Sequence, residues 1–173
     1  MPFIDRTDAG RQLAKALAHY KSQRPVVLAL PRGGVPVAAE IATALEEPRD
    51  LVLVRKIGVP FQPELAMGAV VDGVEPVTVR NEDVIGLIGI DEQEFSKVRD
   101  EQLAEIERRR KKYLGNRQHP ELAGHTVIIV DDGIATGATV RAALRAMRLR
   151  KPRALVLAVP VAPTETLQKL RDE

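Results

Sequence analysis

The chain has 173 residues, 3% aromatic residues, no cysteine and a formal net charge of +2. This length suits one domain, and the lack of cysteine excludes disulfides, thiolate metal sites and a cysteine nucleophile. The few aromatic side chains and the small charge disfavour binding to nucleic acid or to a membrane surface.

Four short runs rich in Val, Ile and Leu predict strands that are buried on both faces, as in parallel sheets. Apolar residues at helical spacing predict four helices. The strands are expected at 26–30, 51–54, 127–130 and 155–159, and the helices at 8–21, 35–45, 91–114 and 139–150. Strands that alternate with helices predict one α/β domain over residues 1–173, with a doubly wound, mainly parallel sheet.

The segment after the second expected strand departs from this alternation. Residues 55–64 contain Pro60 and Pro63, which predict a loop in place of a regular strand or helix. Two short strands are expected at 66–72 and 74–79, around a turn at Asp72. These features predict a flexible loop and a small inserted hairpin or hood lobe at about 56–90.

The most informative stretch follows the third expected strand. It consists of Asp131, Asp132, Gly133, Ile134, Ala135, Thr136, Gly137, Ala138 and Thr139. Ligands of open parallel sheets bind at the carboxyl ends of strands, and glycines, hydroxyls and a helix N-terminus suit a phosphate group. The two carboxylates would repel a phosphate, so we expect them to face sugar hydroxyls or a metal ion. A turn that only caps a helix would not need them.

This stretch resembles the 5-phosphoribosyl 1-diphosphate (PRPP) signature of the type I phosphoribosyltransferases. The resemblance implies that Asp131 and Asp132 bind the ribose hydroxyls and that residues 133–139 hold the 5′-phosphate. Ala135 stands where hypoxanthine–guanine members carry an aspartate as a candidate base, which makes a 6-oxopurine acceptor less expected. Residues 61–70 resemble a subgroup of uncharacterised bacterial members, and that likeness covers nearly the whole chain.

Two further segments are interpreted together with this signature. The turn after the first strand could be a plain connection, but it resembles the family's pyrophosphate loop, which implies that pyrophosphate is bound by Pro31, Arg32, Gly33 and Gly34. Arg55 and Lys56 resemble the basic start of the family's catalytic loop, which implies that they also contact pyrophosphate. The alternative is that they are two solvated cations at a strand end.

The resemblance implies that the chain is an enzyme. It would transfer the phosphoribosyl group of PRPP to a nitrogenous acceptor and release pyrophosphate, with Arg32 and Lys56 as catalytic residues that stabilise the leaving group. Mg²⁺ is the expected cofactor. It would be held through the substrate, with Asp131 and Asp132 as the protein groups that can contribute, and no metal site made of protein ligands alone is expected.

Two alternatives remain open. A regulatory protein that senses PRPP and acts on RNA or DNA is favoured only by the basic run 108–112, which glutamates one turn earlier can neutralise. A catalytically inactive interaction module would not need the residues named above. The apolar stripe of helix 91–114 predicts a packing partner, and a homodimer is expected.

The ends of the chain carry further expectations. No run approaches the roughly 18 apolar residues of a membrane helix, and the first residues show no signal-peptide core, so a soluble cytoplasmic protein without a membrane partner is expected. Family members usually continue beyond the fourth strand with a segment near the acceptor. The chain is therefore expected to be one element short, and its acceptor is not predicted.

Overall fold

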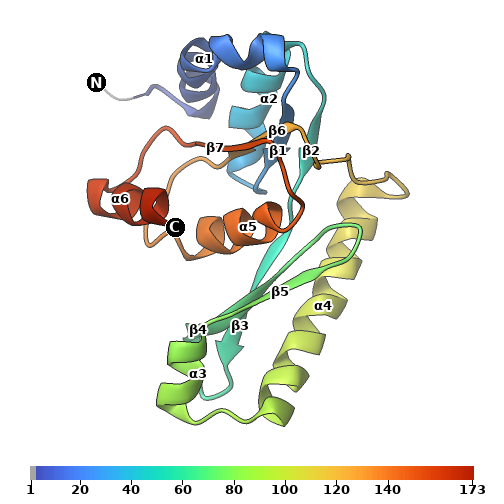
Figure 1. Ribbon diagram of the computed structural model, residues 1–173, viewed down its shortest axis with the longest axis vertical. Coiled ribbons are helices and arrows are strands. Elements are labelled where there is room, and N and C mark those ends of the chain that lie inside the picture. The colour runs from blue at the N-terminus through green and yellow to red at the C-terminus, as the bar shows by residue number, and fades with distance from the viewer. Residues whose placement is uncertain (1–2) are drawn as a thin grey trace. The chain divides into compact units, whose positions relative to one another are not determined.

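The computed structural model describes residues 3–173, which form two compact units (Figure 1). The first unit combines the chain up to Val52 with Pro120–Glu173, and the second unit is Leu53–His119. Within the described residues, no helix has the length and apolar character needed to cross a membrane.

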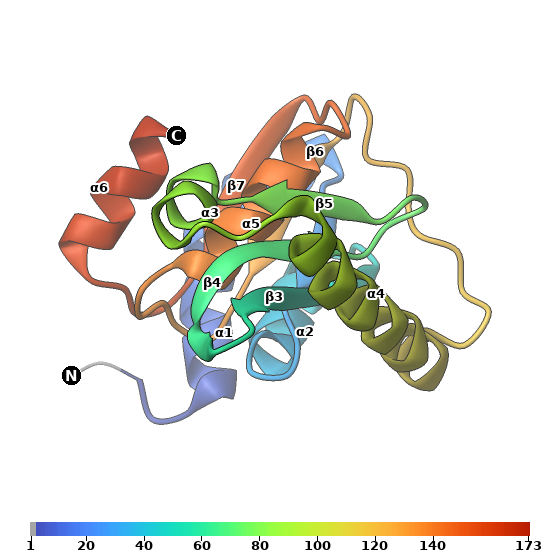
Figure 2. The same cartoon turned by 90° about the horizontal axis from the view of Figure 1, so that it is seen from below.

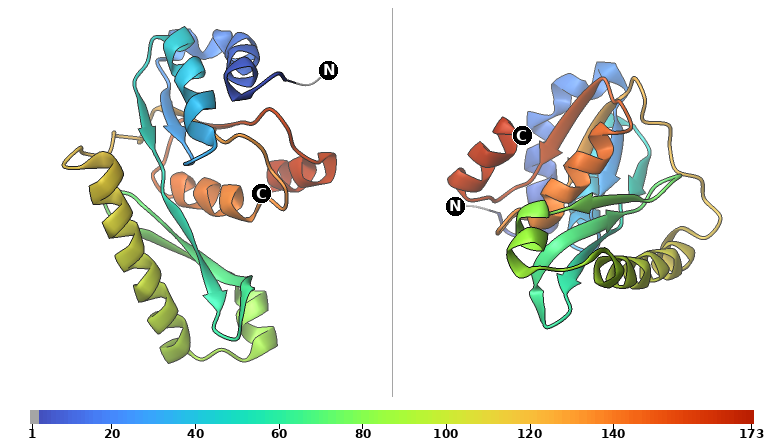
Figure 3. Two further views of the ribbon diagram at one scale, coloured as in Figure 1. Left: turned by 180° about the vertical axis from the view of Figure 1, so that it is seen from behind. Right: turned by 60° about the horizontal axis from the view of Figure 1, so that its bottom comes forward.

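The first unit is a parallel sheet between layers of helices. Its strands are β1 (Val26–Ala29), β2 (Arg49–Leu51), β6 (Thr126–Val130) and β7 (Ala154–Ala158), in the order β2–β1–β6–β7. Its helices are α1 (Arg6–Ala16), the 3₁₀ helix η1 (Ala18–Gln23), α2 (Gly34–Leu45), α5 (Ala138–Arg148) and α6 (Thr164–Asp172). Helices α1 and α2 lie on one side of the sheet and α5 on the other (Figures 1 and 3).

Apart from Thr126, the two central strands are apolar because both of their faces are covered. Val27 of β1 and Ile128 of β6 are fully buried in one cluster with Ile41 of α2. Every residue of β6 is buried. Each such side chain contributes roughly 2 kcal/mol by leaving water, so the core fixes β1 and β6 side by side. The predicted α/β fold with a parallel sheet is confirmed.

The second unit is an antiparallel sheet packed on helices. Its strands β3 (Val54–Val59), β4 (Gln62–Val71) and β5 (Val77–Arg80) pair in that order. Helix α3 (Glu82–Ile88) and the long helix α4 (Glu92–Leu114) follow, and α4 runs along one face of the sheet (Figures 2 and 3). Phe95 and Ile106 of α4 pack against Ile57 and Met67 of the sheet. The apolar stripe of this helix thus has its partner within the unit, and the expected homodimer stays a prediction.

The prediction of a loop at residues 55–64 is wrong, because β3 and the start of β4 form a hairpin there. Pro60 lies in the turn, where Val59 pairs with Gln62, and a turn needs no ladder hydrogen bond from proline. Pro63 lies beside Gly58, where the pairing register shifts. Proline is tolerated at such irregular positions. The unit also extends beyond the lobe expected at 56–90, because α4 supplies part of its core.

Other expected boundaries are close to the observed ones, with two exceptions. The run 51–54 is divided, since β2 ends at Leu51 and β3 begins at Val54. The helix expected at 8–21 is also divided, because α1 ends at Ala16 and η1 follows.

Candidate functional site

The carboxyl ends of β1 and β6 form the point where the chain leaves the sheet in opposite directions. Helix α2 follows β1 on one side of the sheet, and α5 follows β6 on the other (Figure 3). The two strand ends are joined by a hydrogen bond of 2.9 Å from the Leu30 N–H to the Val130 carbonyl. Ligands of doubly wound sheets bind in the crevice at such a switch point.

The loops that follow these strands contact each other closely. A Cβ atom on Gly33 would lie 2.2 Å from the Asp132 carboxylate carbon, and one on Gly34 would lie 2.4 Å from the Val130 carbonyl oxygen. A side chain at Gly34 would collide with backbone, so glycine is required there, whereas a side chain at Gly33 would displace the end of the Asp132 side chain. The structure therefore brings together the expected pyrophosphate loop, Pro31–Gly34, and the expected phosphate loop.

The phosphate loop lines a small cavity of about 170 Å³ at the N-terminus of α5. Gly137 has φ of +81° and precedes the first residue of α5, so the chain turns sharply and leaves helix N–H groups directed outward. Hydrogen bonds from the Ile134 N–H to the Val161 carbonyl (2.9 Å) and from the Thr166 hydroxyl to the Ala135 carbonyl (3.3 Å) tie the loop to the segment after β7. This cavity has the size and donors for a phosphate group.

The two carboxylates at the end of β6 have different surroundings. Burial, with a smaller contribution from the charge of Asp132, raises the pKa of Asp131 to about 6. The Asp131 carboxylate accepts a hydrogen bond of 2.8 Å from the Asp132 N–H. Asp132 forms an ion pair of 2.7 Å with Arg6. Asp131 thus changes between its neutral and charged forms near pH 6, whereas Asp132 is paired with the positive charge of Arg6.

Arg6 was missed by the sequence analysis. It is the first residue of α1, where the helix dipole disfavours a cation. That unfavourable placement is the only sequence signal that could have indicated an acidic partner, and nothing local points to Asp132.

The structure offers few protein ligands for a metal ion. Across residues 3–173 it assembles no group of three or more His, Cys, Asp or Glu side chains able to hold one. Asp131 and Asp132 are adjacent, so an ion at the end of β6 would take most of its ligands from a bound molecule.

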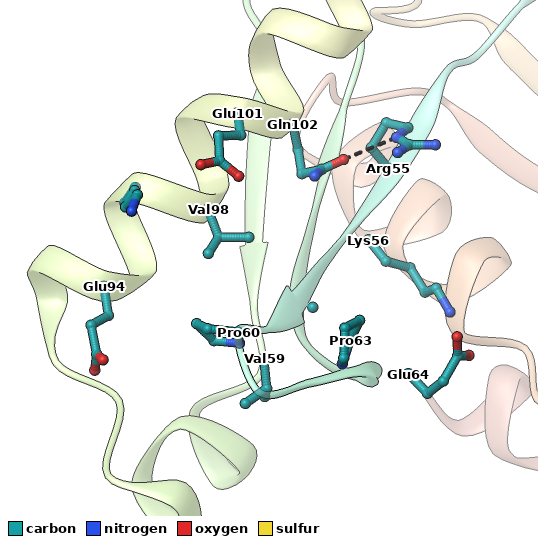
Figure 4. A pocket seen from close by; sticks show the side chains of 12 residues that line it. Arg55, Lys56, Val59, Pro60, Pro63, Glu64, Glu94, Val98, Glu101 and Gln102 are labelled. Atoms are coloured by element: carbon teal, nitrogen blue, oxygen red, sulfur yellow. Dashed lines mark hydrogen bonds between the residues drawn. The ribbon is translucent and has the colours of Figure 1, made fainter.

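Arg55 and Lys56 lie in the second unit, on β3. Arg55 donates a hydrogen bond of 3.0 Å to the Gln102 side chain on α4, and both residues line a cavity of about 590 Å³ (Figure 4). Lys56 is exposed and extends to the same side as Glu64 (Figure 4). Consecutive strand residues face opposite sides, so Lys56 is the freer of the two cations to meet a ligand.

Comparison with known proteins decides the family. Residues 6–172 match the model of the phosphoribosyl transferase domain. The chain belongs to this family. It is 47% identical over 167 residues to the Mycobacterium tuberculosis (H37Rv) protein named "Putative phosphoribosyl transferase Rv0571c". That match covers 96% of this chain but only 37% of the relative, so the chain spans little more than a third of the curated relatives it matches.

Solved structures support the same fold. The protein TT1426 from Thermus thermophilus is 42% identical, with a TM-score of 0.84, and the match covers all of this chain and 81% of that one. A purine phosphoribosyltransferase from Pyrococcus horikoshii shares the fold at 18% identity and a TM-score of 0.53, over 91% of this chain and 72% of that one. The predicted family membership is confirmed.

Proposed function

We propose that this phosphoribosyltransferase-family chain transfers the phosphoribosyl group of PRPP to a nitrogenous acceptor and releases pyrophosphate. The observation that carries the proposal is the close approach of Gly33 to Asp132, which brings the loop after β1 next to the carboxylates that begin the loop after β6. PRPP has the matching pattern, since a ribose with two hydroxyls separates a 5′-phosphate from a pyrophosphate.

Each loop would hold one part of the substrate. The N–H groups at the start of α5, with the hydroxyls of Thr136 and Thr139, would bind the 5′-phosphate. Asp131 and Asp132 would accept hydrogen bonds from the ribose hydroxyls. Arg32 and the N–H groups of the loop after β1 would bind the pyrophosphate.

The reaction needs positioning and charge stabilisation more than proton transfer. The bond from ribose C1′ to the pyrophosphate oxygen breaks, and its electron pair leaves with pyrophosphate. A lone pair of the acceptor nitrogen forms the new bond to C1′, and the proton that this nitrogen carried passes to solvent, because Ala135 offers no base. Arg32 would stabilise the negative charge on the leaving group.

Mg²⁺ would be held mainly by PRPP oxygens, and Asp131 and Asp132 are the protein groups that would contribute ligands. When bound, it would supply positive charge that neutralises the pyrophosphate. The two adjacent carboxylates, Asp131 and Asp132, are the observation that supports a substrate-held ion.

The basic run that favoured the regulatory alternative is partly paired with acidic residues of its own helix. Arg108 and Arg109 pair with Glu105, and Arg110 and Lys111 pair with Glu107, at 2.7–3.8 Å. The hydrogen bonds from Arg108 and Arg109 lower the pKa of Glu105 to about 2, so its charge persists. Glu105 and Glu107 thus offset two of the five positive charges of residues 108–112 on the same helix, and the enzyme is the function we propose.

Calorimetry and turnover test this proposal. PRPP with Mg²⁺ should bind the intact chain, and the double variant Asp131→Asn, Asp132→Asn should weaken binding by at least tenfold. The exposed Asp83→Asn on α3 is the matched control and should bind normally. Pyrophosphate release should depend on one acceptor from a panel of bases. No PRPP binding by the intact chain would overturn the proposal, and binding without release for any base would favour the PRPP sensor.

A further inference from the structure

The cavity of about 590 Å³ in the second unit has no part in the proposed function. It lies between the β3–β4 hairpin and one side of α4 (Figure 4). All of its lining residues belong to Leu53–His119, so the loops that would hold PRPP contribute nothing to it. Its volume is in the range of small-molecule sites, which makes it a candidate site for a second kind of ligand.

Arg55 presents a guanidinium group at one end of this cavity. Side chains alternate along β3, and Ile57 packs against α4, so Arg55 is on the same side of the strand. The Nε group of Arg55 donates a hydrogen bond of 3.0 Å to Gln102 Oε1, and the Arg55 side chain is half-buried. Its other four N–H groups are on the two Nη nitrogens. A guanidinium held in this way can bind a carboxylate through two parallel hydrogen bonds.

Glu101 places a negative charge at the same end of the cavity. It precedes Gln102, and both residues are on the turn of α4 that lies beside Arg55 (Figure 4). Within residues 3–173, Glu101 is exposed and forms no ion pair. An anion bound to Arg55 would be repelled by Glu101 unless the same molecule also carried a positive group. The two side chains therefore suit a molecule in which a carboxylate and an ammonium group are close together.

Apolar side chains line the cavity farther from Arg55. Val98 is half-buried and precedes Gln102 by one helical turn. Val59 and Pro60 lie toward the turn of the hairpin (Figure 4). An aliphatic or aromatic group gains free energy when it leaves water for such a surface. A ligand with its charged groups at the Arg55 end would therefore extend an apolar group along the cavity.

The charges around the cavity balance one another in number. Three cations and three carboxylates line it, which are Arg55, Lys56, Lys97, Glu64, Glu94 and Glu101. A molecule with several charges of one sign, such as PRPP, would be attracted by one set and repelled by the other. A zwitterion can interact favourably with both sets.

We propose that this cavity binds a free α-amino acid with an apolar side chain. The carboxylate of the amino acid would bind the Nη groups of Arg55, and its ammonium group would pair with Glu101. Its side chain would pack on Val98 and Pro60. The inference goes beyond the proposed function and does not depend on it, because none of these contacts involves PRPP.

Calorimetric titration of the full chain without PRPP tests the proposal, with L-leucine and L-phenylalanine as probes. At least one of them should bind, and glycine, which lacks an apolar side chain, should bind at least tenfold more weakly. The N-acetyl and the carboxamide derivatives of that probe each lack one of the two charges, and they should also bind at least tenfold more weakly. The bound probe should slow hydrogen exchange in β3 and leave exchange in β6 unchanged.

Two substitutions locate the binding site. Glu101→Gln removes the partner of the ammonium group, and Arg55→Gln removes the partner of the carboxylate. Each should weaken binding of the probe at least tenfold, and thermal unfolding should show that both variants are folded. The matched control is Glu121→Gln, which removes the charge of an exposed glutamate in the first unit and should leave binding unchanged.

Three results would overturn the inference. The first is that neither leucine nor phenylalanine binds. The second is that an N-acetyl or carboxamide derivative binds as tightly as the free amino acid, which would indicate the end of a peptide as the ligand. The third is that Glu101→Gln binds the probe as tightly as Glu121→Gln, which would place the binding elsewhere on the chain.

Discussion

Arg6 and Asp132, which are 126 residues apart in the chain, form an ion pair of 2.7 Å. The pair joins the first turn of α1 to the end of β6, and both Nε and Nη2 of Arg6 contact the same carboxylate oxygen, Oδ2. The other oxygen, Oδ1, lies beside Gly33 of the loop after β1. Arg6 thus orients the carboxylate that we propose for the ribose.

Replacing Arg6 should affect ligand binding more than folding. The Arg6 side chain is 62% exposed, and exposed ion pairs contribute little to stability. We expect Arg6→Gln to lower the free energy of unfolding by less than about 1 kcal/mol. PRPP affinity should fall about tenfold, or about 1.4 kcal/mol, because Asp132 loses its orientation. Thermal unfolding and calorimetric titration measure the two effects.

The matched control is Arg11→Gln on the same helix. Arg11 pairs with Glu40 at 3.2 Å, and the exposed fractions of 67% and 30% are close to the 62% and 28% of Arg6 and Asp132. It should change stability equally and leave PRPP affinity intact. Equal affinities of the two variants would show that Arg6 does not position Asp132.

The two glycines after β1 should respond differently to alanine. In Gly34→Ala the new methyl group meets the Val130 backbone at 2.4 Å, so we expect a loss of about 2 kcal/mol in the free energy of unfolding. In Gly33→Ala it meets the end of the Asp132 side chain, which can rotate away. Gly33→Ala should therefore be the more stable of the two in chemical unfolding, but should bind PRPP at least tenfold more weakly than the wild type.

Gly86→Ala on α3 serves as the control for both, since a Cβ there meets no atom within 4 Å. It should keep PRPP affinity and gain up to about 1 kcal/mol from better helix propensity. If Gly33→Ala bound PRPP as well as Gly86→Ala, the contact between Gly33 and Asp132 would not matter for the ligand.

The parts of the site that sequence predicted are those with a local pattern. Residues 127–139 contain a buried strand, two carboxylates and a glycine turn in succession, so features that are neighbours in the sequence are also neighbours in the structure. The hairpin of β3 and β4 was hidden because Pro60 and Pro63 break the usual strand pattern while lying at a turn and a register shift. Arg6 could not be connected with Asp132, because only the packing of α1 beside the sheet brings them together.

The pH dependence of stability should report on Asp131. Burial raises its pKa from 3.8 to about 6, so between about pH 4 and pH 6 the folded chain holds a proton that the unfolded chain has lost. Its contribution to stability is complete below about pH 4 and is lost as the pH rises through about 6. Asp131→Asn removes the charge and keeps an oxygen for the Asp132 N–H. Chemical unfolding at pH 7.5 should show a gain on the order of 1 kcal/mol, allowing for solvent screening, and none at pH 4.

Asp50→Asn is the control for this comparison. Asp50 is half-buried and also accepts a hydrogen bond of 2.8 Å from the next backbone N–H, but its chain neighbours are Arg49 and Leu51 in place of a second carboxylate. Its substitution should give no gain that depends on pH. A gain for Asp131→Asn of the same size at both pH values would contradict the assignment of the effect to the Asp131 charge.

A buried pair, Asp72 and His119, should stabilise the second unit. The Asp72 and His119 side chains are 2% and 12% exposed, and their Oδ2 and Nε2 atoms lie 3.2 Å apart with no other hydrogen-bond partner. The Asp72 N–H also donates a hydrogen bond of 2.8 Å to the Leu53 carbonyl, so Asp72 contacts both the first and the last residue of the unit.

His119→Ala leaves the buried Asp72 carboxylate without its partner, and hydrogen exchange in β4 and β5 should show a loss of about 2 kcal/mol in protection. The exposed His125→Ala in the first unit should leave this exchange unchanged. The double variant Asp72→Ala, His119→Ala should lose less than the sum of the two single variants, and additive losses would show that the two residues act independently.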